Sequence, residues 1–302
     1  MLTFSFRLWM DTDKAAYLLE SDENFRVLRR VDVADNHQFN KNVENERTGL
    51  LAVIDTETTG LNPLAGDRII DLAIATCSYG LDTGRLYNVV SRYDSLEDPE
   101  MKIPPDISKL TGITDEMVSR QQIDEASVAR VMDGVALVIC HNASFDRMFL
   151  ESRIPAFANK SFACSFSEIP WKDWGLESLK LDYLGFRYGL FHDGHRARTD
   201  VDMLLSILSQ NCPSSDFSVL STLLEYARQI TYRIFAKGLP FEKKEFVKAR
   251  GYRWSDGKNG SPRAWWIDTI DKTEELDFLS DHGCFSPDVK KYSAKERHRP
   301  FE

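Results

Sequence analysis

The sequence predicts an α/β protein with a mixed sheet, followed by a small α+β module towards the C-terminal end. Three observations predict this architecture. Short apolar runs come first and alternate with amphipathic helices only later, an order typical of a mixed sheet covered by helices. A turn-rich segment at 213–216 then interrupts the apolar pattern, and new short strands and turns begin near residue 231. With 302 residues, the chain is long enough for one domain of ordinary size and smaller appendages.

Residues 1–46 are predicted to form a mostly helical extension. Asp11 or Thr12 is a suitable N-cap for the first helix. The apolar positions of that helix are Ala15, Ala16, Leu18 and Leu19, and Phe25, Val27 and Leu28 continue the pattern. The polar stretch 36–48 is interpreted as a linker to the next domain.

The main domain is predicted over 47–211. Strands are expected at 49–54, 68–75, 86–90 and 135–140, because each is a short apolar run bounded by polar or turn residues. Helices are expected at 105–110, 114–119, 125–133, 176–188 and 199–208, with a further one beginning near residue 145.

A linker helix is predicted over 212–230, and a separate C-terminal module with a tail over 231–302. Within the module we expect strands at 231–236, 252–254 and 263–268 and helices at 241–250 and 272–280. The polar tail after Pro287 is expected to be loose.

The composition limits the classes of function. A net charge of −9 argues against a protein that coats nucleic acid by basic charge alone. The five cysteines form no Cys-x-x-Cys pair, which disfavours a zinc site and a disulfide framework and indicates a reducing compartment. No apolar run reaches transmembrane length, so we expect a cytoplasmic protein without a membrane partner.

Acidic residues stand where apolar segments end. Asp55 and Glu57 follow the 49–54 run, and residues two apart in a strand face the same side, so both carboxylates project together. Asp146 follows the strand at 135–140, and Asp200 begins the helix at 199–208. Four carboxylates nearly balance two divalent cations, and hard oxygen ligands favour Mg²⁺ or Mn²⁺. His195 carries an imidazole suited to accepting a proton near neutral pH.

At these residues the chain resembles the DEDDh exonucleases, in the epsilon-like branch of the DnaQ group. The motifs that carry the resemblance are Val53-Ile-Asp-Thr-Glu-Thr-Thr-Gly-Leu61, His141-Asn-Ala-Ser-Phe-Asp146 and His195-Arg-Ala-Arg-Thr-Asp200. A segment from Ile103 to Val118 is similar to the connection between the first two motifs. The resemblance covers about residues 49–211 and implies a ribonuclease-H-like, mixed five-stranded sheet flanked by helices.

The resemblance also implies roles for individual residues. Asp55, Glu57, Asp146 and Asp200 are expected to be catalytic metal ligands for two Mg²⁺ or Mn²⁺ ions, with His195 as the general base. The expected contacts to the terminal nucleotide come from Thr56, Thr58, Thr59, Gly60, Leu61, Asn142 and Phe145. Asn142 as a simple turn residue and Leu61 as a packing residue are alternatives that stay open.

The implied activity is a metal-dependent 3′→5′ exonuclease that releases nucleoside 5′-monophosphates. The expected partners are single-stranded or frayed 3′ ends of DNA, with RNA as an alternative, and a DNA polymerase or another replication or repair protein. A preference for RNA, and a polymerase-associated or scaffold protein that uses the fold only for binding, are the alternatives.

The C-terminal module combines basic and aromatic residues. From Tyr232 to Trp266 the sequence has nine Lys or Arg against three Asp or Glu, interleaved with eight aromatic residues. Aromatic rings among basic residues suit single-stranded nucleic acid. The alternative is that so small a unit needs these rings for its own core.

Overall fold

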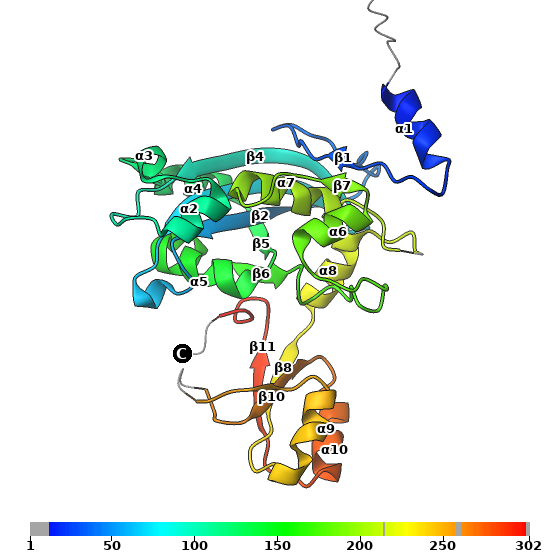
Figure 1. The fold of residues 1–302 in the computed structure, drawn as a ribbon. Coiled ribbons are helices and arrows are strands. Elements are labelled where there is room, and N and C mark those ends of the chain that lie inside the picture. The colour runs from blue at the N-terminus through cyan, green and yellow to red at the C-terminus, as the bar shows by residue number, and fades with distance from the viewer. Residues whose placement is uncertain (1–11, 214, 258–260, 300–302) are drawn as a thin grey trace, which may run out of the picture.

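The computed structural model describes residues 12–213, 215–257 and 261–299 (Figure 1). Its main sheet has five strands in the order β4-β3-β2-β5-β6. They are β2 (Thr48–Thr58), β3 (Ile69–Gly80), β4 (Leu86–Leu96), β5 (Val135–Cys140) and β6 (Ser161–Cys164). β2, β3 and β4 are antiparallel, whereas β5 runs parallel to both β2 and β6. The predicted α/β architecture with a mixed five-stranded sheet is confirmed. The sequence did not locate β6, because four residues are too few to show a periodic pattern.

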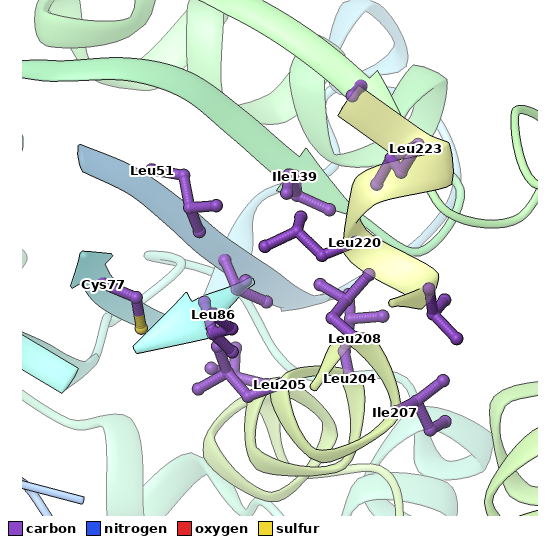
Figure 2. Close-up of a cluster of buried hydrophobic side chains, with 14 of the residues drawn as sticks. Leu51, Cys77, Leu86, Ile139, Leu204, Leu205, Ile207, Leu208, Leu220 and Leu223 are labelled. Atoms are coloured by element: carbon purple, nitrogen blue, oxygen red, sulfur yellow. The ribbon is translucent and has the colours of Figure 1, made fainter. Parts of the chain in front are cut away.

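Helices cover both faces of this sheet. α4 (Glu125–Val131) and α5 (Ala143–Arg153) pack on the face that carries Ala52 and Ile54. The opposite face is covered by α6 (Leu181–Arg187), α7 (Ala197–Leu208) and α8 (Val219–Arg228). Figure 2 shows leucines of α7 and α8 converging on Leu51 of β2 and Ile139 of β5. The alternation of side chains along β2 therefore assigns successive residues to opposite helical layers.

Smaller elements complete the domain. They are η1 (Pro63–Ala65), α2 (Pro105–Thr111), α3 (Asp115–Val118), η2 (Pro155–Phe157) and β7 (Leu190–Phe191). The helix predicted at 176–188 begins only at Leu181. The preceding residues form a loop, in which the carbonyl oxygen of Leu179 lies 2.8 Å from His141 Nε2.

The predicted helical extension at 1–46 is wrong beyond residue 20. α1 (Thr12–Glu20) is a helix, but the chain then becomes extended, and β1 (Arg29–Arg30) pairs in parallel with β7. Val33 is buried in the core of the main domain. The hydrogen bonds to β7 take the place of helical hydrogen bonds, and the burial of Val33 adds apolar contacts. Tertiary contacts therefore override the local helical pattern in this segment. Asp11, the alternative N-cap, lies outside the described residues.

The C-terminal module is a four-stranded antiparallel sheet with the order β11-β8-β10-β9. Its strands are β8 (Thr231–Phe235), β9 (Arg253–Trp254), β10 (Trp265–Thr269) and β11 (Asp288–Tyr292). Its helices are α9 (Lys244–Ala249), which follows η3 (Phe241–Lys243), and α10 (Lys272–Asp281). Ile234, Val247 and Leu279 are fully buried in one cluster, which joins the helices to the sheet.

The tail after Pro287 is not loose, which corrects the prediction. It forms β11 and then runs back to the main domain, as the red segment of Figure 1 shows. The amide of Phe162 in β6 donates to the carbonyl oxygen of Ala294 at 2.8 Å. Arg297, only 5% exposed, forms an ion pair of 2.9 Å with the buried Glu168. The tail therefore supplies a hydrogen-bond acceptor to edge strand β6 and a positive charge to the buried carboxylate of Glu168.

Two further properties concern the described part of the chain. None of its helices is both long enough and apolar enough to cross a membrane. All five cysteines are buried as free thiols.

Candidate active site

Three carboxylates meet at the C-terminal end of β2. Asp55 and Glu57 project from the face of β2 that also carries Leu51 and Val53, and α7 packs on this face. Asp200 lies in the first turn of α7. One oxygen of each of these three carboxylates lies within 4.8 Å of the others. The strand alternation and the packing of α7 thus build the cluster from distant parts of the sequence.

Deprotonation of the clustered carboxyl groups is unfavourable when no cation is bound. Burial and the charges of Asp146, Asp200 and Glu57 raise the pKa of Asp55 well above its ordinary value. Burial, followed by the charges of Asp200 and Asp71, raises the pKa of Glu57 to about 8. Clustered carboxylates become favourable when a cation binds between them, and an all-oxygen donor set suits a hard divalent metal. The residues present therefore fit a divalent-metal site.

Asp146 reaches the site from the opposite helical layer. It lies in the first turn of α5, is only 2% exposed and is not one of the three clustered residues. Its Oδ1 accepts hydrogen bonds from the backbone amide of Thr56 at 3.1 Å and from Thr56 Oγ1 at 2.8 Å. Burial raises the pKa of Asp146 to about 7, whereas the bonds from Thr56 lower it. The charge of Asp146 also contributes to the raised pKa values of Asp55 and Glu57.

Asp200 is held by a histidine that the sequence did not single out. His192 Nε2 lies 3.0 Å from Asp200 Oδ1, and the side chain of His192 is only 2% exposed. The backbone amide of Arg196 donates to Asp200 Oδ2 at 3.2 Å. No feature of the sequence distinguishes His192 from a loop histidine, because its contact depends on how the loop before α7 folds.

His195, the predicted general base, lies on the same loop, but among the described residues no hydrogen bond or ion pair joins it to the carboxylates. It is exposed and has a φ of +66°, in the left-handed region that is uncommon for residues other than glycine. Within residues 12–213, 215–257 and 261–299, its ring forms no hydrogen bond or ion pair. The structure thus brings together Asp55, Glu57 and Asp200, leaves Asp146 outside this cluster, and leaves His195 exposed.

A fifth acid and a cation border the cluster. Asp71 of β3 is the register partner of Glu57 in β2, and it is 5% exposed. Arg196 Nε donates to Asp71 Oδ2 at 2.9 Å. Burial raises the pKa of Asp71, and the bond from Arg196 opposes this shift. Asp71 was not predicted from the sequence, although an acid inside the apolar run 69–75 is a signal that could have indicated it.

The predicted substrate-contacting turn is largely occupied with its own hydrogen bonds. Thr58 Oγ1 donates to the carbonyl oxygen of Gly60 at 2.6 Å, and Thr59 exchanges two bonds of 2.9 Å with the backbone of Arg68. A Cβ on Gly60 would lie 2.4 Å from the Asp67 carboxyl group, so a larger residue there would require the Asp67 side chain to move. Leu61, in contrast, is 80% exposed at the tip of the turn.

Asn142 and Phe145 stand at the start of α5. Asn142 adopts a φ of +85°, and its carbonyl oxygen accepts the amide of Phe145 at 2.9 Å, which makes it the residue that turns β5 into α5. The ring of Phe145 is partly buried, 5.1 Å from the ring of Phe149.

Comparison with known proteins identifies the family of the domain that contains these carboxylates. The family model described as an exonuclease, RNase_T, matches residues 52–208, which include all four carboxylates and His195. The chain belongs to this exonuclease family. The predicted kinship with DnaQ-like exonucleases is therefore confirmed, and the carboxylate cluster agrees with the dependence of this family on divalent metals.

Individual relatives match about half of the chain. The 3′-5′ exonuclease DinG of Bacillus subtilis (strain 168) is 32% identical over 161 residues, which are 50% of this chain and 16% of the relative. DNA polymerase III subunit epsilon of Treponema pallidum (strain Nichols) is 29% identical over 165 residues, 51% of this chain and 73% of that subunit. The solved structure of exonuclease X in complex with 5′-overhanging duplex DNA is 23% identical, with a TM-score of 0.43, and covers 58% of this chain and 98% of that chain.

Proposed function

We propose that this protein is a 3′→5′ exonuclease that removes single nucleotides from the 3′ ends of single-stranded DNA. The observation that carries the proposal is the meeting of Asp55, Glu57 and Asp200 within 4.8 Å, inside a domain of the exonuclease family. A carboxylate cluster of this kind serves phosphodiester hydrolysis through bound divalent metals. DNA is favoured over RNA because the relatives include a subunit of a DNA polymerase.

Two ions, Mg²⁺ or Mn²⁺, fit the number of carboxylates. Asp55, Glu57 and Asp200 would hold one ion, and Asp55 together with Asp146 would hold the second. When bound, the metals supply charge that activates the attacking water and stabilises the leaving oxygen.

Neighbouring residues keep the carboxylates in place. Thr56 fixes Asp146 through two hydrogen bonds, and His192 fixes Asp200 through one. Partners of this kind orient ligands and tune their basicity. We propose that the exposed imidazole of His195 accepts the proton of the attacking water. This imidazole has no competing partner among the described residues. Water adds to phosphorus, and the bond from phosphorus to the 3′ oxygen of the preceding nucleotide breaks. That oxygen takes up a proton from solvent and becomes the new 3′ hydroxyl of the strand, and a nucleoside 5′-monophosphate leaves.

The substrate approaches the site past exposed groups. Leu61 is an exposed apolar residue on the turn that follows β2, and we propose that it contacts the terminal base, with Phe145 and Asn142 on the α5 side. A DNA polymerase or another replication or repair protein is the proposed protein partner, since the relatives include a polymerase III subunit.

A nuclease assay with oligonucleotides labelled at the 5′ end tests this proposal. With Mg²⁺ or Mn²⁺ the labelled strand should shorten one nucleotide at a time and release unlabelled nucleoside 5′-monophosphates, and EDTA should prevent this. Release of the label itself as a mononucleotide at the start would instead show attack from the 5′ end. Faster degradation of the RNA strand of equal sequence would overturn the assignment to DNA.

A further inference from the structure

We propose that the C-terminal module holds a second nucleic-acid site, a pocket that captures a base of single-stranded DNA. The module pocket is a cavity of about 330 Å³ between β9, β10 and the start of α9, and its main lining residues are Pro240, Phe241, Lys244, Trp254, Arg263 and Trp265. The inference rests on the proposed function, because it describes how the same substrate is held at a distance from the carboxylates.

The aromatic rings of the pocket are more exposed than a core would require. Trp254 is 50% exposed and Phe241 is 74% exposed. Neither residue belongs to the buried clusters of the module, although Trp265 packs against one of them. Trp254 lies on β9, the edge strand of the module sheet, and its ring centroid is 5.4 Å from that of Trp265. Exposed rings that converge on a cavity indicate a binding site rather than a core.

Positive charge gathers at the same pocket. Lys244 Nζ lies 4.0 Å from the ring centroid of Phe241, and Arg263 is exposed beside it. In the part of the chain that the structure describes, neither Lys244 nor Arg263 forms an ion pair. Several other basic residues of the module are already paired with carboxylates: Arg233, Lys237, Lys248 and Arg250. The positive charges of Lys244 and Arg263, at the rim of the pocket, therefore remain available to a ligand.

This combination selects one class of ligand. A cation would be repelled by Lys244 and Arg263, although aromatic pockets otherwise attract cations. A neutral apolar ligand would leave both charges without a partner. A nucleotide satisfies both features, because its base offers a π-face to Trp254 and Phe241 and its phosphate offers a charge to the rim.

Binding measurements without metal test the inference apart from cleavage. We would titrate the full-length protein in EDTA into fluorescent oligothymidylate of about 12 nucleotides and follow anisotropy, a length within the range of known single-strand sites. Trp254→Ala should weaken binding by about 5- to 150-fold, the equivalent of one lost stacking contact. Trp254→Phe should retain most of the affinity because it keeps a ring.

Matched variants separate the pocket from general surface effects. Lys244→Ala should weaken binding and reduce the salt slope by about 0.7, the value for one phosphate contact on a single strand. Phe217→Ala, an aromatic residue 73% exposed outside the module, and Lys290→Ala on β11 should bind like the wild type.

Unchanged affinity for the folded Trp254→Ala protein would overturn the inference, even if the enzyme degrades DNA in Mg²⁺. Equal weakening by Phe217→Ala or Lys290→Ala would also overturn it, and so would tighter binding of oligouridylate than of oligothymidylate. Absence of cleavage in Mg²⁺ would contradict the proposed function alone, since the effect of Trp254→Ala is measured without metal.

Discussion

Replacing Glu57 by Gln should make the metal-free protein more stable at alkaline pH. Burial and neighbouring acids raise the pKa of Glu57 from 4.5 in the unfolded chain to about 8 in the folded protein. The folded state therefore binds the proton more tightly, and the free energy of unfolding falls as the pH rises from about 4.5 to about 8. At about 1.36 kcal/mol for each pKa unit, the loss accumulates to a few kcal/mol, with an upper bound of about 5 kcal/mol. Glu57→Gln removes this loss.

The assay is urea unfolding in EDTA at about pH 4 and about pH 9, on either side of the window in which the two states bind different numbers of protons. The stability of Glu57→Gln relative to the wild type should increase between the two pH values. Glu242→Gln, an exposed position in the module, is the matched control and should show no such increase. Saturating Mn²⁺ should stabilise the wild type more than Glu57→Gln, because the ion compensates the clustered charge. Parallel pH profiles for wild type and Glu57→Gln would refute the reasoning.

Three further substitutions test other parts of the account. Thr56→Val removes the hydroxyl bond to Asp146 and should weaken Mn²⁺ binding by about 10- to 100-fold; an unchanged affinity in a calorimetric titration would argue against a positioning role. His195→Ala should lower the cleavage rate by about 10²- to 10⁴-fold and leave Mn²⁺ affinity nearly unchanged, whereas a large loss of affinity would make this histidine a ligand. Arg297→Ala withdraws the guanidinium from the buried Glu168 and should destabilise the protein by about 3 kcal/mol in urea unfolding. If Arg297→Ala were as stable as the wild type, the ion pair between the tail and Glu168 would not contribute to stability.

Local sequence patterns predicted the central elements of the site. The period of two along β2 predicts that Asp55 and Glu57 project together, and the same rule sends Thr56 to the other face, where it meets Asp146. The apolar face of α7 predicts that Asp200 lies over the sheet. These features depend on local periodicity and on packing of one apolar face against another, which the sequence encodes directly.

Contacts between distant loops and edges were not predictable in the same way. Whether His192 or His195 meets Asp200 depends on the left-handed turn at His195. The pairing of Arg297 with Glu168 joins residues 129 positions apart. Strand β11 forms only because β8 offers it a partner, and its polar residues show no apolar alternation. Such contacts follow from the tertiary arrangement, so no short window of sequence contains them.

The proposed function requires that a carboxylate-held metal site cuts DNA from its 3′ end. The most direct measurement compares the cleavage of end-labelled single-stranded DNA by the wild type, Asp55→Ala and Asp200→Ala in Mg²⁺, with the folding of each protein checked by circular dichroism. Both variants should fold and should retain less than about a tenth of the wild-type rate, because loss of a metal removes several kcal/mol of transition-state stabilisation. A folded variant of either kind that cleaves DNA at close to the wild-type rate would contradict the account.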